Sequence, residues 1–528
     1  MTLYHTNAPG QRLVTGAIVE VGATGLADSG AGIGEVAAAG GPVTVHVAGL
    51  LPGERALARV EHVSPHRRQA WAHIDERLGE HAAERVPPAC PGHGACGGCV
   101  WQHLSYAGQL LHKRRRVVQA CAAYERLAGI EVAAVSPAAR VLHYRNVGKY
   151  VAGPARDAEG GLTLGSYAPR SHRVVDGTGC RVVAPNIEAV RAHAAVALAS
   201  LPVYDEQNKT GWLRYLVLRQ GVDDRVLATV VTRSSAERAS VTEAAHRLAE
   251  HPRVAGIVWL RNDRANSSLL DGTWEPVCGR STAAENVAGV EIELGVRDFF
   301  QVNRAQAREL YREVARQAGF SPDEPSGDGA RAGDGASAQV IVDLFCGVGG
   351  IAFTLARAAA QANRTCRILG IERSPDAVRA AERAAERAGL STRLWFQSAP
   401  AVEVVARVRA WCAAIGRPGS PPADSAIEPA GDSAVEPAGD SAVGLVVVNP
   451  PRKGLQADTV RALVELEPRR IIYVSCGPVS LARDLDRLID GGYRVDVVQP
   501  IDLMPGTPQI ETVVGLTREA PGRVVDRP

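Results

Sequence analysis

The sequence contains no long apolar segment and no strong excess of charge of either sign. No apolar run approaches the roughly 18 residues that a bilayer-spanning helix requires, and the first residues, MTLYHTNAPGQ, are not a basic-then-apolar signal segment. We therefore expect a soluble cytoplasmic protein without membrane contact. The formal net charge of +2 does not decide whether the protein binds nucleic acid, because such binding requires a local basic surface and not a large total charge.

The chain is long and apolar enough for several domains. Its 528 residues correspond to about three domains of ordinary size, and 46% of them are hydrophobic, which is sufficient for several cores. Ten cysteines in a reducing compartment are not expected to form disulfides. A tight group of them therefore indicates a metal site or a catalytic thiol.

Residues 1–78 are predicted to form a small antiparallel β-barrel. Apolar and polar residues alternate at period two between glycine-rich turns, with the apolar positions at Val43, Val45, Val47, Leu57, Val60 and Val63. Such a barrel is either an accessory domain without a site or an oligonucleotide-binding-type module that grips RNA backbone.

Three cysteines, Cys90, Cys96 and Cys99, lie within ten residues in the segment CPGHGACGGC. The intervening glycines let the backbone fold around a centre, so the three thiolates can converge on a metal. A fourth ligand must come from elsewhere, and Cys180, after the turn-rich RSHRVVDGTGC, is the candidate. Spacing alone leaves an iron–sulfur cluster, a tetrahedral zinc site and a metal-free turn open. His93 is expected to be a turn residue and not a ligand.

Residues 79–295 are predicted to form a mixed α+β central domain. A helix expected over residues 108–129 carries the basic run HKRRR at 112–116, which is either a solvated face or an RNA contact. Strands are expected at 212–219, 226–232 and 256–260.

Residues 296–528 contain the stretch that indicates a cofactor site. The segment VIVDLFCGVGG at 340–350 reads as a parallel strand that ends in an acid, followed by a tight loop with Gly347 and Gly350 and an Ala-rich crossover helix. This pattern is typical of an α/β fold that binds a nucleotide-like cofactor. Glu372, at the end of the next predicted strand, is placed to accept both hydroxyls of a ribose.

Two segments interrupt this region. Residues 321–338 are rich in glycine, proline, serine and aspartate, and residues 417–444 repeat DSAIEPAG and DSAVEPAG at a period of eight. We expect disordered insertions without catalytic content.

Four further side chains are candidates for the site. Gln301 lies just before a helix predicted over 305–319, where a helix N-terminus can meet a cofactor. Asn449 begins an N-P-P turn that Arg452 follows; amino-group methyltransferases have an aromatic residue there, so amine methylation is disfavoured. Cys476 lies where a strand turns into a helix that is expected to lower its pKa, which favours a nucleophile over a buried structural cysteine. Glu511 is an acid in an apolar strand, which is costly unless it is paired or functional.

These motifs together resemble those of the RNA uracil-5-methyltransferases, which make 5-methyluridine in ribosomal or transfer RNA. The motifs are DLFCGVGG, FFQVN, NPPRKG, VSCGP and TPQIE, after a C-x5-C-x2-C run and a segment similar to a TRAM domain. The resemblance implies a class I methyltransferase (Rossmann-like) domain that uses S-adenosylmethionine, an RNA-binding TRAM barrel and a [4Fe-4S] cluster in place of zinc. It assigns the cluster to Cys90, Cys96, Cys99 and Cys180, cofactor contacts to Gln301, Phe345, Glu372 and Asn449, the nucleophile to Cys476 and the base to Glu511. The chain departs from the usual pattern at Asn449, where Asp is commoner, and at Gly477, Gly506 and Gln509.

The reaction that the resemblance implies requires both catalytic groups. Cys476 adds to C6 of a flipped uracil, C5 then takes the methyl group, and Glu511 removes the C5 proton before the thiol leaves. The TRAM-like segment favours ribosomal over transfer RNA, and we expect a monomer. Alternatives are a transfer-RNA uracil-5-methyltransferase and a non-catalytic iron–sulfur RNA-binding protein. A cytosine-5 RNA methyltransferase ranks lower, because no cysteine lies beside the N-P-P turn.

Overall fold

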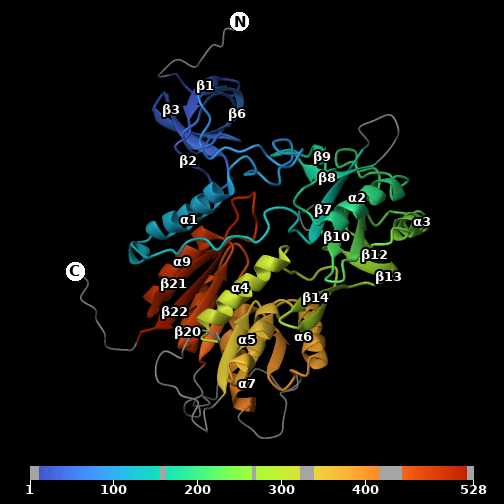
Figure 1. Ribbon diagram of the computed structural model, residues 1–528, viewed down its shortest axis with the longest axis vertical. Coiled ribbons are helices and arrows are strands. Elements are labelled where there is room, and N and C mark those ends of the chain that lie inside the picture. Colours follow the sequence, from blue (N-terminus) through green and yellow to red (C-terminus); the bar gives the residue numbers. More distant parts are fainter. Residues whose placement is uncertain (1–10, 155–161, 265–268, 321–337, 416–442, 520–528) are drawn as a thin grey trace.

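The computed structural model describes residues 11–154, 162–264, 269–320, 338–415 and 443–519. The insertions expected at 321–338 and 417–444 fall almost wholly outside these ranges. Three large sheets follow one another along the chain, from the N-terminal sheet at the top of Figure 1 to the C-terminal sheet at the bottom. In the described part of the chain, no helix is long and apolar enough to cross a membrane.

The N-terminal sheet has six strands in the order β1-β5-β6-β4-β3-β2. The strands are β1 (Ile18–Gly22), β2 (Gly25–Leu26), β3 (Gly32–Ala38), β4 (Gly41–Val47), β5 (Arg55–Val63) and β6 (Gln69–Leu78). The predicted alternation is confirmed in β4, where Val43, Val45 and Val47 are all buried. In β5 the predicted position Val60 is buried, but Leu57 is not one of the inward positions, which are Ala56, Ala58 and Val60; the prediction for Leu57 is wrong, and this residue lies on the opposite face.

The central sheet has seven strands in the order β13-β12-β11-β10-β7-β8-β9. The strands are β7 (Val147–Gly153), β8 (Thr163–Tyr167), β9 (Val174–Asp176), β10 (Leu213–Gln220), β11 (Val226–Thr232), β12 (Val254–Arg261) and β13 (Thr273–Gly279). Helices α2 (Pro185–Ala197) and α3 (Arg238–Ala249) pack on one face of it. A two-stranded ribbon, β14 (Ala283–Val287) and β15 (Val290–Leu294), leads to the next domain. The three strands predicted from the sequence correspond to β10, β11 and β12 and are confirmed.

The C-terminal sheet also has seven strands, in the order β18-β17-β16-β19-β20-β22-β21. The strands are β16 (Gln339–Leu344), β17 (Cys366–Glu372), β18 (Leu394–Ser398), β19 (Leu445–Val448), β20 (Arg470–Ser475), β21 (Tyr493–Ile501) and β22 (Glu511–Arg518). The pairs from β18 to β20 are parallel, whereas β22 is antiparallel to both β20 and β21. The carboxyl ends of β16, β17, β19 and β20 therefore meet the start of β22 at one edge of the sheet.

Helices cover both faces of this sheet, which confirms the predicted α/β class. They are α4 (Arg304–Gln317), α5 (Gly350–Gln361), α6 (Pro375–Arg387), α7 (Val404–Ile415), α8 (Ala457–Leu466) and α9 (Pro478–Asp490), with a 3-10 turn at Ala401–Glu403. One core joins α4, α5 and α6 to one face, and a second joins α7, α8 and α9 to the other. Because both faces are buried, strands such as β19 are apolar at every position.

Helix α1 (Tyr106–Ala122), which follows the three clustered cysteines, packs against α9 although about 360 residues separate the two (Figure 1). A 3-10 turn at Glu125–Leu127 packs on α9, and the chain after this turn runs beside β21. There, Ala133 N donates to Val498 O (3.0 Å) and Ser136 N donates to Pro500 O (2.9 Å). The segment that links the N-terminal and central sheets is thus built onto the C-terminal domain.

Candidate active site

The predicted cofactor loop lies between β16 and α5 and is shaped by left-handed backbone. Phe345, Gly347 and Gly349 have φ angles of 64°, 54° and 86°. Gly347 N donates to Glu372 Oε2 (3.1 Å), so the acid that ends β17 reaches the loop. The other oxygen, Oε1, accepts from Ser374 N (2.9 Å). The loop and Glu372 therefore form one unit.

Asp343, the acid that ends the β16 run, lies beneath this loop. Its side chain has no exposed surface, and its Oδ2 accepts from Ala352 N (3.1 Å) in the first turn of α5. Burial, and secondarily the charge of Glu372, raise its pKa to about 8. The strand pattern showed this acid, but we had not assigned it to the site.

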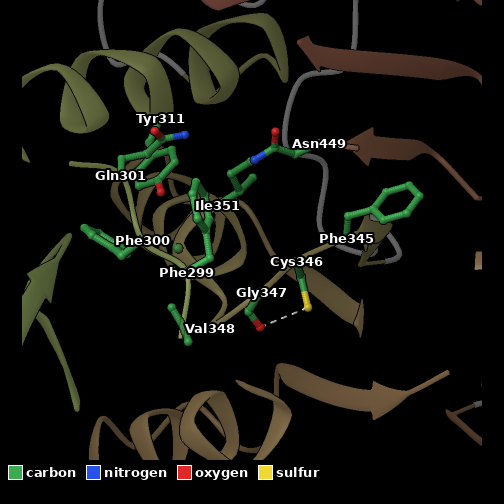
Figure 2. Close-up of a pocket in the computed structure, with 11 residues that line it drawn as sticks. Phe299, Phe300, Gln301, Tyr311, Phe345, Cys346, Gly347, Val348, Ile351 and Asn449 are labelled. Atoms are coloured by element: carbon green, nitrogen blue, oxygen red, sulfur yellow. Dashed lines mark hydrogen bonds between the residues drawn. The ribbon is translucent and has the colours of Figure 1, made fainter. Parts of the chain in front are cut away.

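A hollow lies in front of the loop (Figure 2). Of the predicted cofactor residues it brings together Gln301, Phe345, Gly347, Gly350 and Asn449. The sequence did not identify the remaining lining residues as site residues: Phe299, Phe300, Tyr311, Cys346, Val348 and Ile351. Most of these are apolar and could be recognised only as core.

Two lining residues show how the hollow is built. Tyr311 of α4 lies very close to Gly350: a Cβ atom at position 350 would be 2.9 Å from the hydroxyl oxygen of Tyr311. This close approach explains why residue 350 is a glycine. The ring of Phe345 packs against the second core and is drawn in Figure 2 turned away from the other lining side chains.

The N-P-P turn closes the hollow on the side of β19. Asn449 N donates to Leu344 O (3.2 Å), which ties the turn to the end of β16. Farther along the turn, Arg452 O accepts from Ser480 Oγ (2.9 Å) in the first turn of α9. Arg452 is thereby held at the start of the helix that follows Cys476.

Cys476 and Glu511 lie at neighbouring strand ends. Ser475, the last residue of β20, is paired with Thr512 of β22 in antiparallel register. Cys476, which follows Ser475, therefore comes level with Glu511, which precedes Thr512. The two side chains are near enough for the charge of Glu511 to raise the pKa of the Cys476 thiol. The sequence singled out both residues, and the register explains why they meet.

The predicted lowering of the Cys476 pKa is wrong for this state of the protein. Burial, with Glu511 as the second cause, raises it to about 11, while Arg452 acts in the opposite direction. The thiol is half-buried, and the desolvation of its charged form outweighs the helix N-terminus. Burial also raises the pKa of Glu511, to about 8.

The four candidate metal ligands come to one region. Cys96 and Cys180 both lie close enough to Cys99 to raise its pKa by their charge, and burial raises that pKa further, to about 11. Cys90 lies on the same turn, where its carbonyl accepts from His93 N (3.1 Å). However, among the described residues no group of three or more His, Cys, Asp or Glu side chains has the arrangement of a metal site.

The basic run on α1 faces inward, so its interpretation as an RNA-contacting or solvated face is wrong. His112 and Lys113 are buried, and Arg114 Nε donates to Val132 O (2.8 Å). Arg116 pairs with Asp28 of the N-terminal domain (2.8 Å), which leaves Arg115 as the exposed member of the run.

Comparisons with known proteins agree with this arrangement. The family profile described as "Methyltransferase domain" matches residues 336–405, and the one described as "tRNA (Uracil-5-)-methyltransferase" matches residues 439–519. An uncharacterized RNA methyltransferase of Geobacter sulfurreducens is 31% identical over 522 residues, which cover 97% of this chain and 92% of that protein. One from Halalkalibacterium halodurans is 28% identical over 94% of this chain and 96% of its own.

A solved structure shares the whole fold. The tRNA (uracil-54, C5)-methyltransferase of Pyrococcus abyssi, crystallised with S-adenosyl-L-homocysteine, matches with a TM-score of 0.66 at 22% identity. The match covers 94% of this chain and 99% of that one, so the C-terminal domain has the class I methyltransferase fold.

Proposed function

This chain belongs to the RNA methyltransferase family, and we propose that it methylates carbon 5 of uracil in RNA with S-adenosylmethionine as the methyl donor. The observation that carries the proposal is the placement of the Cys476 thiol beside the Glu511 carboxyl at the edge of the sheet where the glycine loop lies. Uracil C5 is too weak a nucleophile to take a methyl group unaided. It therefore requires a nucleophile for C6 and a base for the C5 proton.

The hollow has features that suit a nucleoside. A Cβ atom at Gly347 would meet nothing within 4 Å, so the space in front of the loop is open. Gln301 and Asn449 present amide groups to it, and Glu372 lies behind Gly347 as an acceptor for ribose hydroxyls. When bound, S-adenosylmethionine supplies an electrophilic methyl group.

The chain's own groups perform the remaining steps. The Cys476 thiol gives its proton to solvent, the thiolate bonds to C6, and the electron pair of the C5–C6 double bond moves to C5. Once C5 carries the methyl group, Glu511 removes the C5 proton, the double bond re-forms and the Cys476 thiolate leaves. Arg452 favours the thiolate, and a carboxyl with a pKa of about 8 is an effective base near neutral pH.

The N-terminal sheet supports an RNA substrate, which we propose it binds as a TRAM-type barrel. His46 stacks on Trp71 with ring centroids 5.3 Å apart, and His62 lies against the same indole at 5.5 Å. Aromatic side chains on a β-sheet are a common platform for unpaired bases. Trp71→Ala should raise the KM for RNA roughly 5- to 50-fold with little change in kcat, whereas Trp274→Ala, on exposed strand β13, should change neither.

The deciding experiment measures transfer of labelled methyl groups to unmodified ribosomal and transfer RNA, with nucleoside analysis of the product. We expect 5-methyluridine in ribosomal RNA and none with the Cys476→Ala variant. Product in transfer RNA alone would keep the reaction and change the substrate. If the folded wild-type protein labels neither RNA, the enzyme assignment fails and an RNA-binding protein without catalysis takes its place.

We also propose that Cys90, Cys96, Cys99 and Cys180 hold a [4Fe-4S] cluster. Arg145 supports it, because its Nε is buried without a hydrogen-bond partner in the described structure and its charge acts on Cys99. A cation there can balance the negative charge of four thiolates. Protein purified without oxygen should contain iron and acid-labile sulfide in equal amounts. Zinc in their place, or no metal, would contradict the assignment.

A further inference from the structure

We infer that Gln109 and Lys113 of helix α1 are positioning residues for Glu511. They hold residues 502–510, called here the base loop, which joins β21 to β22 and ends at Glu511. The inference rests on the proposed function and extends it, because it assigns a catalytic consequence to a helix that lies nearly 400 residues earlier in the chain.

Lys113 fixes the beginning of the base loop. Its Nζ lies 2.6 Å from Asp502 Oδ1, and neither side chain has any exposed surface. The same ammonium donates to Met504 O (3.0 Å), and Met504 N donates to Asp502 Oδ1 (3.0 Å). A buried ion pair is stable only in a narrow geometry, so these contacts hold the first turn of the loop in one conformation. The other carboxylate oxygen, Asp502 Oδ2, is buried without a hydrogen-bond partner in the described structure, so Lys113 is the main support of this charge.

Gln109 fixes the middle of the loop. Its Oε1 accepts from Gly506 N (2.7 Å), and its Nε2 donates to Trp101 O (3.1 Å) and Leu104 O (2.9 Å). Trp101 N in turn donates to Gly506 O (2.9 Å). The backbone N–H of Gly506 is therefore bound to α1, and its carbonyl is bound to the segment between the clustered cysteines and α1.

The rest of the base loop is held in the same way. Tyr144 Oη donates to Pro505 O (3.0 Å), Asn303 Nδ2 donates to Leu503 O (3.0 Å), and Arg116 donates to Pro508 O. Each of these donors lies outside the C-terminal sheet. Glu511, the first residue of β22, is paired with Ile501 of β21 but has no paired residue in β20, whereas Cys476 follows β20, which is paired on both sides within that sheet. The contacts that hold the base loop from outside the sheet are called here the brace. Loosening the brace should therefore move the base and leave the nucleophile in place.

This difference predicts a specific kinetic defect. Methyl transfer to C5 needs Cys476 and the donor, whereas proton removal from C5 needs Glu511. A displaced base should leave the methylated RNA bonded to Cys476, and this adduct is visible on a denaturing gel as labelled methyl that migrates with the protein. Loss of alignment of about 1 Å slows a step by up to about 100-fold.

The test is a single-turnover reaction with labelled S-adenosylmethionine and the RNA that the wild-type protein methylates. Gln109→Ala should form the adduct at nearly the wild-type rate and release it roughly 10- to 100-fold more slowly. The double variant Lys113→Met, Asp502→Asn should do the same, because it removes the ion pair without leaving a buried charge. The matched control is Gln119→Ala, the same change at an exposed position of α1, which should behave as wild type.

Equal slowing of adduct formation and release in Gln109→Ala would overturn the inference, because it would show only a structural role. Unchanged kinetics would overturn it as well. A wild-type protein that forms neither adduct nor product would instead remove the proposed function. In that case amide hydrogen exchange still tests the brace, since Met504 and Gly506 should exchange faster in Gln109→Ala and not in Gln119→Ala.

Discussion

The glycine loop at 345–349 and the base loop at 502–510 both border the candidate site, yet different parts of the chain hold them in place. The glycine loop is fixed from within its own domain: Gly347 N donates to Glu372, and Phe345 N and Cys346 N donate to Ile371 O on the same neighbouring strand. The base loop is held largely from outside, by Gln109, Lys113 and neighbouring residues of the linking segment. One loop is a property of a βαβ unit, and the other is a property of the complete chain.

This difference explains how a common fold can acquire a particular chemistry. A loop fixed by adjacent strands can serve any methyltransferase of this class, because its contacts need only the sheet and one helix. A base loop that depends on a segment more than 350 residues away ties the base to the presence of the whole protein. The four predictions below test this contrast.

The largest effect is expected where the two regions meet, at the catalytic pair. Cys476→Ala should lower turnover by about 10³-fold or more, because uracil C5 is then no longer activated. Glu511→Gln should reduce turnover similarly but accumulate the methylated RNA adduct. Quantified nucleosides and a denaturing gel distinguish the two outcomes.

The control for this pair is Cys278→Ala, a thiol on β13 in the central domain. It should retain wild-type turnover. If Cys476→Ala remained fully active while Cys278→Ala did not, the assignment of the nucleophile would be wrong.

The next largest effect concerns the support of the base loop. Lys113→Met leaves Asp502 buried without its cation, which should lower the free energy of unfolding by about 3–5 kcal/mol in urea denaturation. Adding Asp502→Asn should recover most of this loss, because no buried charge remains. If the single and double variants were equally unstable, lost packing and not the ion pair would account for the effect.

The same contrast shows what the sequence could predict. Asp343 and Glu372 lie at the carboxyl ends of two adjacent parallel strands, and Gly347 lies in the loop after the first of them. Their positions can therefore be deduced from the order of strands in a parallel sheet. Cys476 and Glu511 could be chosen by residue type, but only the register of β20 with β22 brings them together. These steps need no information beyond strand periodicity and chemistry.

The brace could not be predicted in this way. Lys113 lies in the run HKRRR, and a cluster of charges is ordinarily a solvated surface; its burial depends on Asp502, which is 389 residues away. The predicted lowering of the Cys476 pKa was also wrong, because the burial that raises this pKa depends on the elements packed around the strand end. Long-range pairing of polar groups has no local periodic signal.

A smaller effect is expected in how the free energy of unfolding depends on pH, through Asp343 at the end of the strand before the glycine loop. Because burial raises the pKa of Asp343 to about 8 in the folded state, the folded protein holds a proton that the unfolded chain releases above the ordinary Asp range. Stability should therefore fall as pH rises from 5 toward 8, by about 1 kcal/mol per pH unit from this group. Asp343→Asn should remove this share of the slope and leave the share of Glu511, whose pKa burial also raises to about 8. An unchanged slope in urea titrations of the variant would show that Asp343 is not its source.

The smallest effects should come from alanine in the two loops. Gly349 and Gly506 both have positive φ, and so does Gly289, where an added Cβ would meet nothing within 4 Å. Gly289→Ala thus measures the backbone cost alone, about 1 kcal/mol. Gly506→Ala should cost little more, since its Cβ would lie 3.3 Å from Gln102 Cγ, a contact that a shift of a few tenths of an ångström relieves. Gly349→Ala should cost about 2 kcal/mol or more, because its Cβ would lie 2.9 Å from the buried rings of Phe353 and Phe396. Urea denaturation gives all three values, and a larger loss at Gly506 than at Gly349 would mean that the remote brace is the less adaptable of the two supports.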